Sequence, residues 1–236
     1  MRKANRRAAA DGAGAPGVAG GGRLAPAGVL RAVQQQVLRA FATAGRPPAA
    51  PALAETAARY GTAADAVLAR LHATDILRLG SGGEIRAAYP FSGVPTRHVV
   101  DIDGGPRVHA MCAIDALGIA AMLGTRVVIT SADPGTGEPI AVTVQADGKT
   151  AAWQPRTAVV FSGQRGPGGP GDAERGAPGG PAAAEVCCGY MNFFVSHPSA
   201  AAWAATHPEV TGSVLDQTAA LREGRGTFGS LLADGH

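Results

Sequence analysis

The segment RVHAMCAIDALGIAAML, residues 107–123, carries a thiol and a carboxyl group within an otherwise apolar stretch. Residues 108–123 are apolar nearly all round, which predicts a helix that is buried on every side. Cys112 and Asp115 are three residues apart, so on such a helix both side chains would point toward the same space. Because an ionised carboxylate is costly to bury without a partner, we expect Asp115 to have a specific task.

The segments around this helix predict a domain of mixed strands and helices. β-rich runs are expected before it, in HVVDIDG, and after it, in the hairpin TRVVITSADPGTGEPIAVTVQ and in TAVVFS. The segment AEVCCGYMNFFVS, residues 184–196, predicts another strand by its β-branched and aromatic content. A helix, a short strand and a final helix are expected after it. Residues 163–181 contain 12 Gly or Pro among 19 residues, which predicts a mobile surface loop rather than part of a core.

The first half of the chain predicts a smaller helical module. Three helices followed by a hairpin with a Gly-rich turn are expected in residues 24–92, an arrangement typical of winged-helix modules. Residues 1–23 are rich in Gly, Ala and basic side chains and are expected to form a disordered tail. The predicted class is α+β, with a winged-helix-like domain over 24–92 and a mixed strand and helix domain over 93–236, the latter interrupted by the 163–181 insertion.

Charge and cysteine content narrow the function classes. The net charge is +3, but residues 1–23 carry five basic residues against one acidic residue, so the remainder has a net charge of −1. In the last expected helix of the module Arg70 is opposed by Asp65 and Asp75, so we interpret the module as a scaffold and expect no nucleic-acid partner. No run of 18 apolar residues is present, so no membrane span is expected. Three cysteines are a poor disulfide framework and favour a reducing cytoplasm.

Two more thiols, Cys187 and Cys188, lie in the strand expected near residue 190. Neighbouring residues of a strand point to opposite faces, so only one of the two can join Cys112 and Asp115. The face that carries Cys187 is the more apolar, which mildly favours Cys187. Two thiols and a carboxyl group suit a soft metal, because thiolates hold such ions and a carboxyl group moves protons. Zinc fits less well, since a structural zinc site needs four protein ligands, and His109 is expected to be a bystander.

Three blocks together resemble the organomercurial (alkylmercury) lyases: HAMCAIDALGIAAMLGTRVVITSADPGTGEPIAVTV, VCCGYMNFFVS and AAAWAATH. The resemblance extends over about residues 24–232 and implies a winged-helix-like N-terminal region before a catalytic domain of strands and helices. It places the family's catalytic residues on Cys112, Asp115 and the first of the paired cysteines, Cys187. Met111 stands where many members of the family have a Trp, which is a departure next to the expected site.

The resemblance implies protonolysis of the carbon–mercury bond of R–Hg⁺. A thiolate of Cys112 or Cys187 would attack the mercury, and Asp115 would accept the displaced thiol proton and later protonate the carbon to release R–H. The product Hg²⁺ would stay on the two cysteines beside Asp115 until low-molecular-weight thiols or a mercuric reductase remove it. No organic cofactor is implied.

Two alternatives stay open. A soft-metal-responsive DNA-binding regulator would use the N-terminal module to bind DNA and the cysteines to sense the metal. The near-neutral last helix and the presence of Asp115, which a pure sensor does not need, argue against it. Met111 leaves room for a relative of the lyases with an altered metal or substrate preference.

Overall fold

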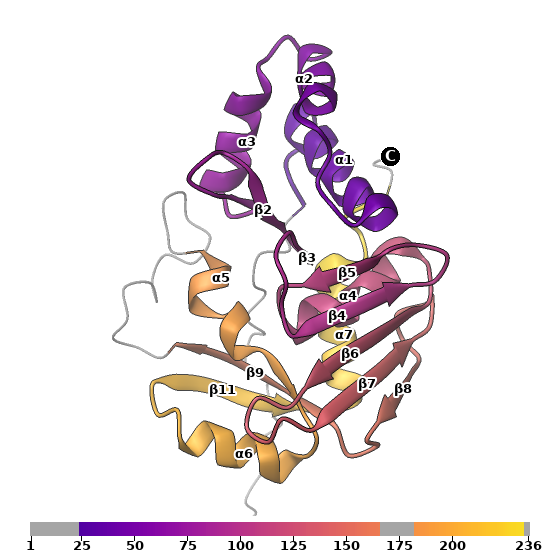
Figure 1. The fold of residues 1–236 in the computed structure, drawn as a ribbon, viewed down its shortest axis with the longest axis vertical. Coiled ribbons are helices and arrows are strands. Elements are labelled where there is room, and N and C mark those ends of the chain that lie inside the picture. Colours follow the sequence, from indigo (N-terminus) through magenta and orange to yellow (C-terminus); the bar gives the residue numbers. More distant parts are fainter. Residues whose placement is uncertain (1–23, 166–181, 234–236) are drawn as a thin grey trace, which may run out of the picture.

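The computed structural model describes residues 24–165 and 182–233. The predicted tail lies outside these residues, and so does the predicted insertion apart from residues 163–165, which end strand β9 (Val159–Arg165). Helices and strands are mixed along the described chain, which confirms the predicted α+β class (Figure 1). Within the described ranges, no helix combines the length and the apolar character that crossing a membrane requires.

Three helices form the end of the molecule at the top of Figure 1. They are α1 (Val29–Ala44), α2 (Ala50–Ala58) and α3 (Ala64–Ala73). Helix α1 ends at Gly45, whose left-handed backbone (φ 70°) lets its N–H bond to the Phe41 carbonyl. Phe41 also stacks on Phe91 with ring centroids 5.4 Å apart, which attaches the helical end to the strands below it.

An antiparallel sheet of eight strands runs from this helical end into the body of the molecule. In spatial order the strands are β1 (Leu77–Leu79), β2 (Ile85–Ala88), β3 (Phe91–Ser92), β5 (Arg107–Ala110), β4 (His98–Ile102), β6 (Val127–Ala132), β7 (Pro139–Val144) and β8 (Ala151–Gln154). The hairpins expected in both halves of the chain are present as β1–β2 and β6–β7. Because β3 pairs with β5, the sheet and the main hydrophobic core are continuous across residue 93, where we expected a domain boundary. That boundary and the winged-helix assignment stay predictions.

A second antiparallel sheet, with the order β10 (Asn192–Phe194), β9 and β11 (Val210–Leu215), lies at the other end of the molecule. Helix α6 (His197–Ala205) packs on this sheet through Trp203. The Trp203 ring lies 5.5 Å from the ring of Phe161 and 5.6 Å from that of Phe194. These aromatic contacts form a small core of their own beside the main one.

The Asp133 carboxylate links the two sheets. It follows β6, and one of its oxygens accepts hydrogen bonds from the Val195 N–H (3.0 Å) and the Ser199 hydroxyl (2.6 Å). Its other oxygen accepts from the N–H groups of Gly135 (2.8 Å) and Thr136 (3.1 Å). Burial raises the pKa of Asp133, but these four hydrogen bonds outweigh it and leave the pKa below its usual value. The ionised carboxylate therefore fixes the end of β10 against the β6–β7 hairpin.

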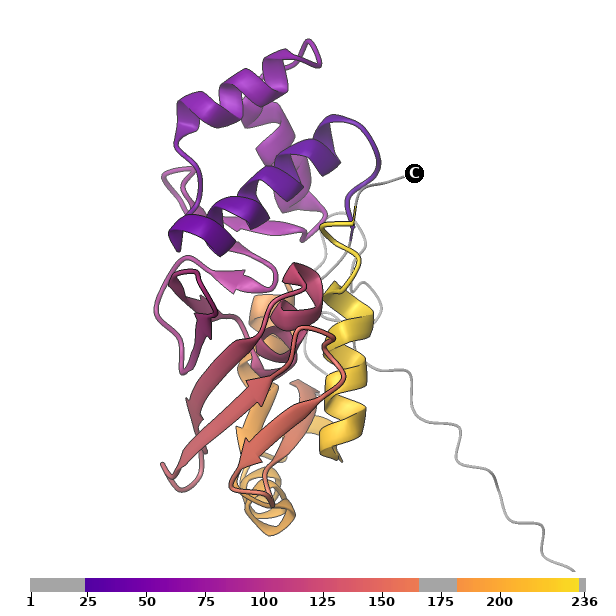
Figure 2. The same ribbon diagram turned by 90° about the vertical axis from the view of Figure 1, so that its right-hand side faces the viewer.

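Helix α4 (Ala113–Leu123) lies under the large sheet with α7 (Gln217–Phe228) along its other side (Figure 2). Nine of the eleven residues of α4 are buried, as its apolar sequence predicts. Two glycines allow the helices to meet backbone to backbone. A Cβ on Gly118 would lie 2.7 Å from the Gly224 carbonyl oxygen and would overlap the Phe228 side chain, and a Cβ on Gly224 would lie 2.9 Å from the Gly118 nitrogen.

Two secondary-structure predictions are wrong, and both concern segments that carry cysteines. The helix expected over 108–123 begins only at Ala113, because the residues before it complete strand β5. Of the segment 184–196, where a strand was expected, only Asn192–Phe194 forms one, as β10. The chain before it makes a helical turn, α5 (Ala183–Val186), and a 3₁₀ turn, η1 (Cys188–Tyr190). The Ala-Ala-Glu sequence favours helix, and the β-branched and aromatic residues that suggested a strand lie mostly after Gly189.

Gly118→Ala is expected to destabilise the protein, because a methyl group there has no room between α4 and α7. Overpacking of this kind typically costs about 1–3 kcal/mol. Gly226→Ala on α7 is the matched control, since a Cβ at that position meets nothing within 4 Å. It should be neutral or stabilising by up to ~1 kcal/mol through helix propensity. Urea unfolding followed by circular dichroism measures both variants, and equal stabilities would contradict the proposed close approach.

Candidate functional site

A cysteine thiol caps the start of helix α4. Cys112 is the N-cap residue with an extended backbone (φ −152°), and its Sγ accepts a hydrogen bond from the Asp115 N–H at 3.4 Å. The N–H of Ala113 is bound by the Met191 carbonyl at 3.0 Å. These bonds satisfy two N–H groups that a helix start leaves without intrahelical partners, and they hold the thiol at the positive end of the helix dipole. The predicted proximity of Cys112 and Asp115 is confirmed, although the helix begins later than expected.

Cys188 completes a group with these two residues. The Sγ atoms of Cys112 and Cys188 and a carboxyl oxygen of Asp115 all lie within 4.8 Å of one another. All three side chains are buried, with exposed fractions of 2%, 5% and 2% for Cys112, Cys188 and Asp115. Two soft sulfur atoms and one carboxyl oxygen, drawn from two distant segments, therefore converge at the N-terminus of α4.

Cys187 lies outside this group, contrary to the expectation from the sequence. Its thiol donates a hydrogen bond to the Ala183 carbonyl at 3.2 Å, on the preceding helical turn. The expectation rested on the alternation of side chains along a strand, and no strand forms there, so the argument that selected Cys187 does not apply. The sequence signal that could have indicated a turn is Gly189, directly after Cys188, because glycine weakens a strand interior.

The other side chains near the site have different partners. The Nδ1 atom of His109 lies 3.1 Å from both the backbone nitrogen and the carbonyl oxygen of Thr96. The Cys112 thiol donates to the Met191 thioether at a sulfur–sulfur distance of 3.8 Å. Met111, which departs from the family pattern, is partly buried and packs against the core.

Burial keeps the site protonated. It raises the pKa of the Asp115 carboxyl from 3.8 to about 8, and hydrogen bonds from Cys112 offset only part of this effect. Its Oδ2 atom is buried and accepts no hydrogen bond from any residue that the structure describes. Burial also raises the pKa of Cys112 to about 11. At neutral pH the resting site therefore consists mainly of neutral groups.

The contact between the two thiols acts on them in opposite directions. Hydrogen bonding with Cys112 is the main cause that raises the pKa of Cys188, followed by Cys187 and burial. The same contact lowers the pKa of Cys112, against the larger effect of burial. Burial remains the larger effect on Cys112, so the pKa values of both thiols lie above their usual value.

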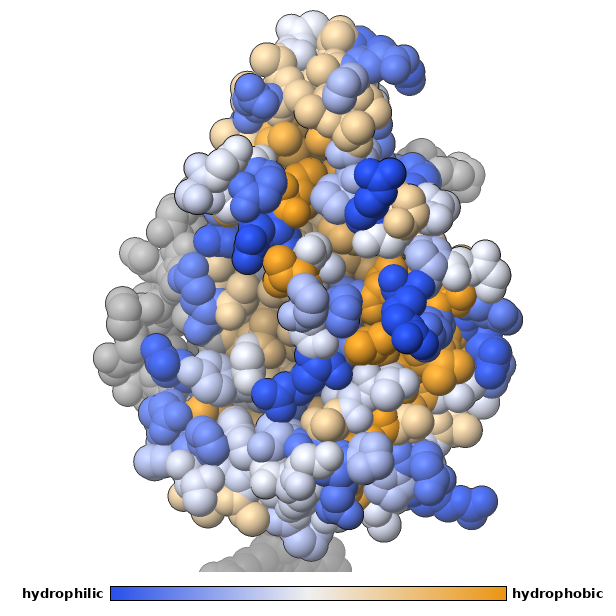
Figure 3. Space-filling view, in the orientation of Figure 1, coloured by the Kyte–Doolittle hydropathy of each residue, from blue (hydrophilic) through white to orange (hydrophobic). Residues whose placement is uncertain are grey.

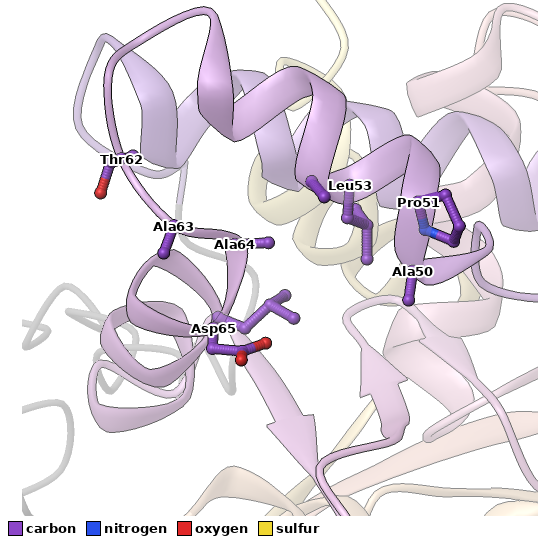
Figure 4. A pocket seen from close by; sticks show the side chains of 9 residues that line it. Ala50, Pro51, Leu53, Thr62, Ala63, Ala64 and Asp65 are labelled. Carbon is purple, nitrogen blue, oxygen red and sulfur yellow. The ribbon is translucent and has the colours of Figure 1, made fainter.

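A surface pocket lies elsewhere, between helices α2 and α3. Hydrophobic side chains reach the surface between the N-terminal helices (Figure 3), and the pocket there has a volume of about 430 Å³. Its lining includes Leu53, Ala64 and Asp65 but none of the buried thiols (Figure 4). The chemistry of the protein is therefore not expected in this pocket, because Asp65 is its one titratable lining residue.

Comparison with known proteins connects the buried group to a family. Residues 91–229 match the family model of the alkylmercury lyases (MerB). An alkylmercury lyase of Staphylococcus epidermidis is 30% identical over 171 residues, which are 72% of this chain and 71% of that protein. An alkylmercury lyase of Streptomyces lividans is 31% identical over 139 residues, but only 58% of this chain and 57% of that protein are aligned. An alkylmercury lyase of Pseudomonas putida is 32% identical over 115 residues, which are 49% of this chain and 48% of that protein.

The fold is that of a solved relative. The mercury-bound form of MerB2 superposes with a TM-score of 0.68 at 24% sequence identity, over 88% of this chain and 93% of that chain. The region matched by the family model contains Cys112, Asp115 and Cys188. With more than half of its residues matched by the family model and 72% of its length aligned to a relative at 30% identity, the chain belongs to the alkylmercury lyase family.

Proposed function

We propose that this protein cleaves the carbon–mercury bond of an organomercurial, R–Hg–X, and yields R–H and Hg²⁺. The observation that carries the proposal is the buried group of two thiols and one carboxyl at the start of α4, within the region that matches the family. Thiolate sulfur is the ligand that soft metals prefer. The carboxyl group adds a proton donor, which binding alone does not need, so this set of groups favours bond cleavage over storage of the ion.

Cys112 is the first ligand of the substrate in this mechanism. Its place at the N-terminus of α4, the positive end of the helix dipole, favours the thiolate on Cys112 when the substrate arrives. The Cys112 sulfur displaces X from the mercury, and X leaves with the thiol proton as HX. The Sγ atom of Cys188, which lies within 4.8 Å of the Cys112 Sγ, then binds the same mercury atom.

Asp115 transfers the second proton. The protonated carboxyl gives its proton to the carbon, and the electron pair of the mercury–carbon bond forms the new carbon–hydrogen bond. The carboxylate then takes the proton of the Cys188 thiol. In total R–Hg–X and two thiols become R–H, HX and a mercury bis-thiolate, and Asp115 ends as it began. Its Oδ2 atom is suited to this transfer, since no hydrogen bond within the described residues occupies it.

Removal of Hg²⁺ requires other sulfur ligands, because the ion is held by two thiolates. We infer that low-molecular-weight thiols or a mercuric reductase accept it. The proposed steps use three side chains of the chain itself, and no organic cofactor takes part in them. The three cysteines are free, which fits a reducing compartment such as the cytoplasm.

The N-terminal part is assigned the role of a winged-helix-like scaffold in this proposal, with its boundary near residue 92. Asp65 and Arg70 are the charged residues on the exposed face of α3, and the other exposed side chains of that helix are alanines. With one carboxylate and one cation this face has no excess positive charge for phosphates, so we infer neither a nucleic-acid partner nor a DNA-binding regulator. A lyase relative with altered substrate preference would differ first at Met111.

Replacing each of the paired cysteines by serine tests which sulfur acts. Cys188→Ser should lower R–H release by at least ~10²-fold, because loss of a metal ligand costs more than loss of the groups that support one. Cys187→Ser should retain most activity, since a serine hydroxyl can keep the hydrogen bond to the Ala183 carbonyl. Gas chromatography of R–H in the presence of excess thiol gives both rates. The reverse order of activities would assign the second sulfur to Cys187.

Asp115→Asn should separate metal binding from cleavage. The amide keeps the shape of the side chain but has no acidic proton, so R–H release should fall ~10²–10⁴-fold, the usual cost of losing a general acid. Hg²⁺ should still bind with one ion per chain, because the two thiols remain. Asp103→Asn, at an exposed position, is the control and should leave both measurements unchanged. An Asp115→Asn protein with the wild-type rate would rule out this carboxyl as the proton donor.

The stability difference between Asp115→Asn and the wild type should depend on pH. Between about pH 4 and about pH 8 the folded wild type holds a proton on Asp115 that the unfolded chain has lost. Folding takes up this proton, so the contribution of Asp115 to stability falls as the pH rises through this range. The neutral amide lacks this loss, and the advantage of the variant should therefore grow with pH and level off above about pH 8.

Urea unfolding of both proteins at matched pH values measures this difference. The comparison at equal pH is necessary because burial lowers the pKa of His98 to about 3. The His98 shift has the opposite effect on stability, because the buried neutral ring costs stability as the pH falls below the usual histidine range. This effect is the same in both proteins, so it cancels in the difference between them. Cys112, which faces Asp115, titrates above this window at about 11. A difference that stays constant from pH 4 to pH 8 would show that Asp115 is ionised in the folded protein.

A further inference from the structure

Two side chains from the N-terminal part of the chain hold the start of helix α5. One oxygen of the Asp75 carboxylate accepts a hydrogen bond from the Ala183 N–H at 2.7 Å. The Tyr89 hydroxyl accepts one from the next N–H, that of Ala184, at 3.2 Å. The same hydroxyl donates to the other Asp75 oxygen at 3.2 Å, so the two side chains act as one unit. Figure 1 shows α5 beside β2 and the end of α3, where these residues are located.

Asp75 and Tyr89 are both held firmly by their surroundings. Asp75 has a left-handed backbone (φ 53°) in the turn between α3 and β1, which points the chain from the helix into the sheet. Tyr89 lies between β2 and β3 with an exposed fraction of 1%. Arg78 adds a second link, because its guanidinium lies 3.4 Å from Glu185 of α5 and 3.8 Å from Asp75. The start of α5 is therefore attached to a fixed part of the molecule.

Helix α5 depends on these contacts. It has four residues, too few for a helix to be stable by itself in water, and its own N-cap residue, Ala182, offers no side-chain acceptor. The hydrogen bonds of Asp75 and Tyr89 replace that missing cap. Only Cys187 separates α5 from Cys188, the first residue of η1, so the orientation of α5 determines where the Cys188 sulfur lies.

The other end of the segment is attached to the site itself. The Met191 carbonyl accepts the Ala113 N–H of α4 at 3.0 Å, and the Asn192 amide donates to the Gly189 carbonyl at 3.0 Å. Cys188 is thus located between two anchors, one on α4 and one on the pair Asp75 and Tyr89. The second anchor bears on the segment that carries Cys188, whereas Cys112 and Asp115 are held by α4.

We propose that Asp75 and Tyr89 are positioning residues that fix the Cys188 sulfur beside Cys112 and Asp115 by capping helix α5. The N-terminal part is then a component of the reaction site and not only a scaffold. The inference rests on the proposed function for its effect on rate, but its effect on metal coordination can be measured separately. Neither residue touches the substrate in this account, since both act through the backbone of α5.

Tyr89→Phe is the main test, because it keeps the buried ring and removes only the hydroxyl. Capture of the substrate by Cys112 should persist, so KM should change by about twofold or less, while kcat falls roughly 10–10²-fold, as for a misplacement of about 1 Å. X-ray absorption of the Hg²⁺-loaded protein should count fewer protein sulfur ligands per mercury than in the wild type. A thiol-alkylating reagent should label Cys188 faster and Cys112 at an unchanged rate.

Tyr60→Phe is the matched control, since Tyr60 belongs to the same N-terminal part and is 53% exposed. It should match the wild type in every measurement. Asp75→Asn provides a second test if Tyr89→Phe folds poorly, because asparagine tolerates the left-handed backbone and keeps one acceptor for the Ala183 N–H. It should change kcat and labelling in the same direction by a smaller factor.

The outcomes distinguish this inference from a purely structural role. If Tyr89→Phe lowers only the melting temperature and leaves kcat, sulfur coordination and Cys188 labelling unchanged, the positioning role is refuted. If the wild type releases no R–H at all, the proposed function fails. The inference then still stands or falls on the mercury–sulfur coordination and labelling of the same variants.

Discussion

The burial of the Asp115 carboxyl is the constraint on which the rest of the site depends. The carboxyl is 2% exposed at the start of α4, where the large sheet and α7 enclose the helix. Surroundings of this kind disfavour charge, so a side chain that is usually an anion becomes a proton donor near neutral pH. The close approach at Gly118 and Gly224 maintains these surroundings, because larger residues there would separate α7 from α4 and admit solvent.

Two separate stretches of the chain, the start of α4 and residues 183–195, meet at this buried point, and both are held by hydrogen bonds to backbone groups. Ala113 of α4 is bound by the Met191 carbonyl, the end of β10 by Asp133 at Val195, and the start of α5 by Asp75 at Ala183. Backbone anchors of this kind fix the path of a segment whatever side chains it carries. They give two thiols from distant segments a defined separation, which side-chain packing alone would leave loose.

The sequence was sufficient to predict the α+β class, both hairpins, the buried helix and the meeting of Cys112 with Asp115, because each depends on local periodicity or spacing. The choice between Cys187 and Cys188 depends instead on the path of residues 182–191, which the caps supplied by Asp75 and Tyr89 influence. Composition suggested a strand there, and alternation along that strand selected Cys187, whereas the turns that form instead place Cys188 in the buried group. No local sequence pattern indicates a helix cap supplied by residues that are 108 and 95 positions away in the chain. The helix start was misplaced for a similar reason, since the apolar sequence suits both β5 and α4.

The proposed reaction is compatible with such a buried site, because no step of the reaction leaves a net charge in the site. The resting group consists mainly of two neutral thiols and a neutral acid, as burial requires. The neutral complex R–Hg–X enters, neutral HX and R–H leave, and Hg²⁺ is balanced by two thiolates. A site of the same shape with an ionised carboxylate would bury one negative charge throughout, and it would have no proton to give to the carbon. The removal of the carboxyl from water is therefore the single cause that keeps the resting site neutral and leaves Asp115 with the proton that cleavage needs.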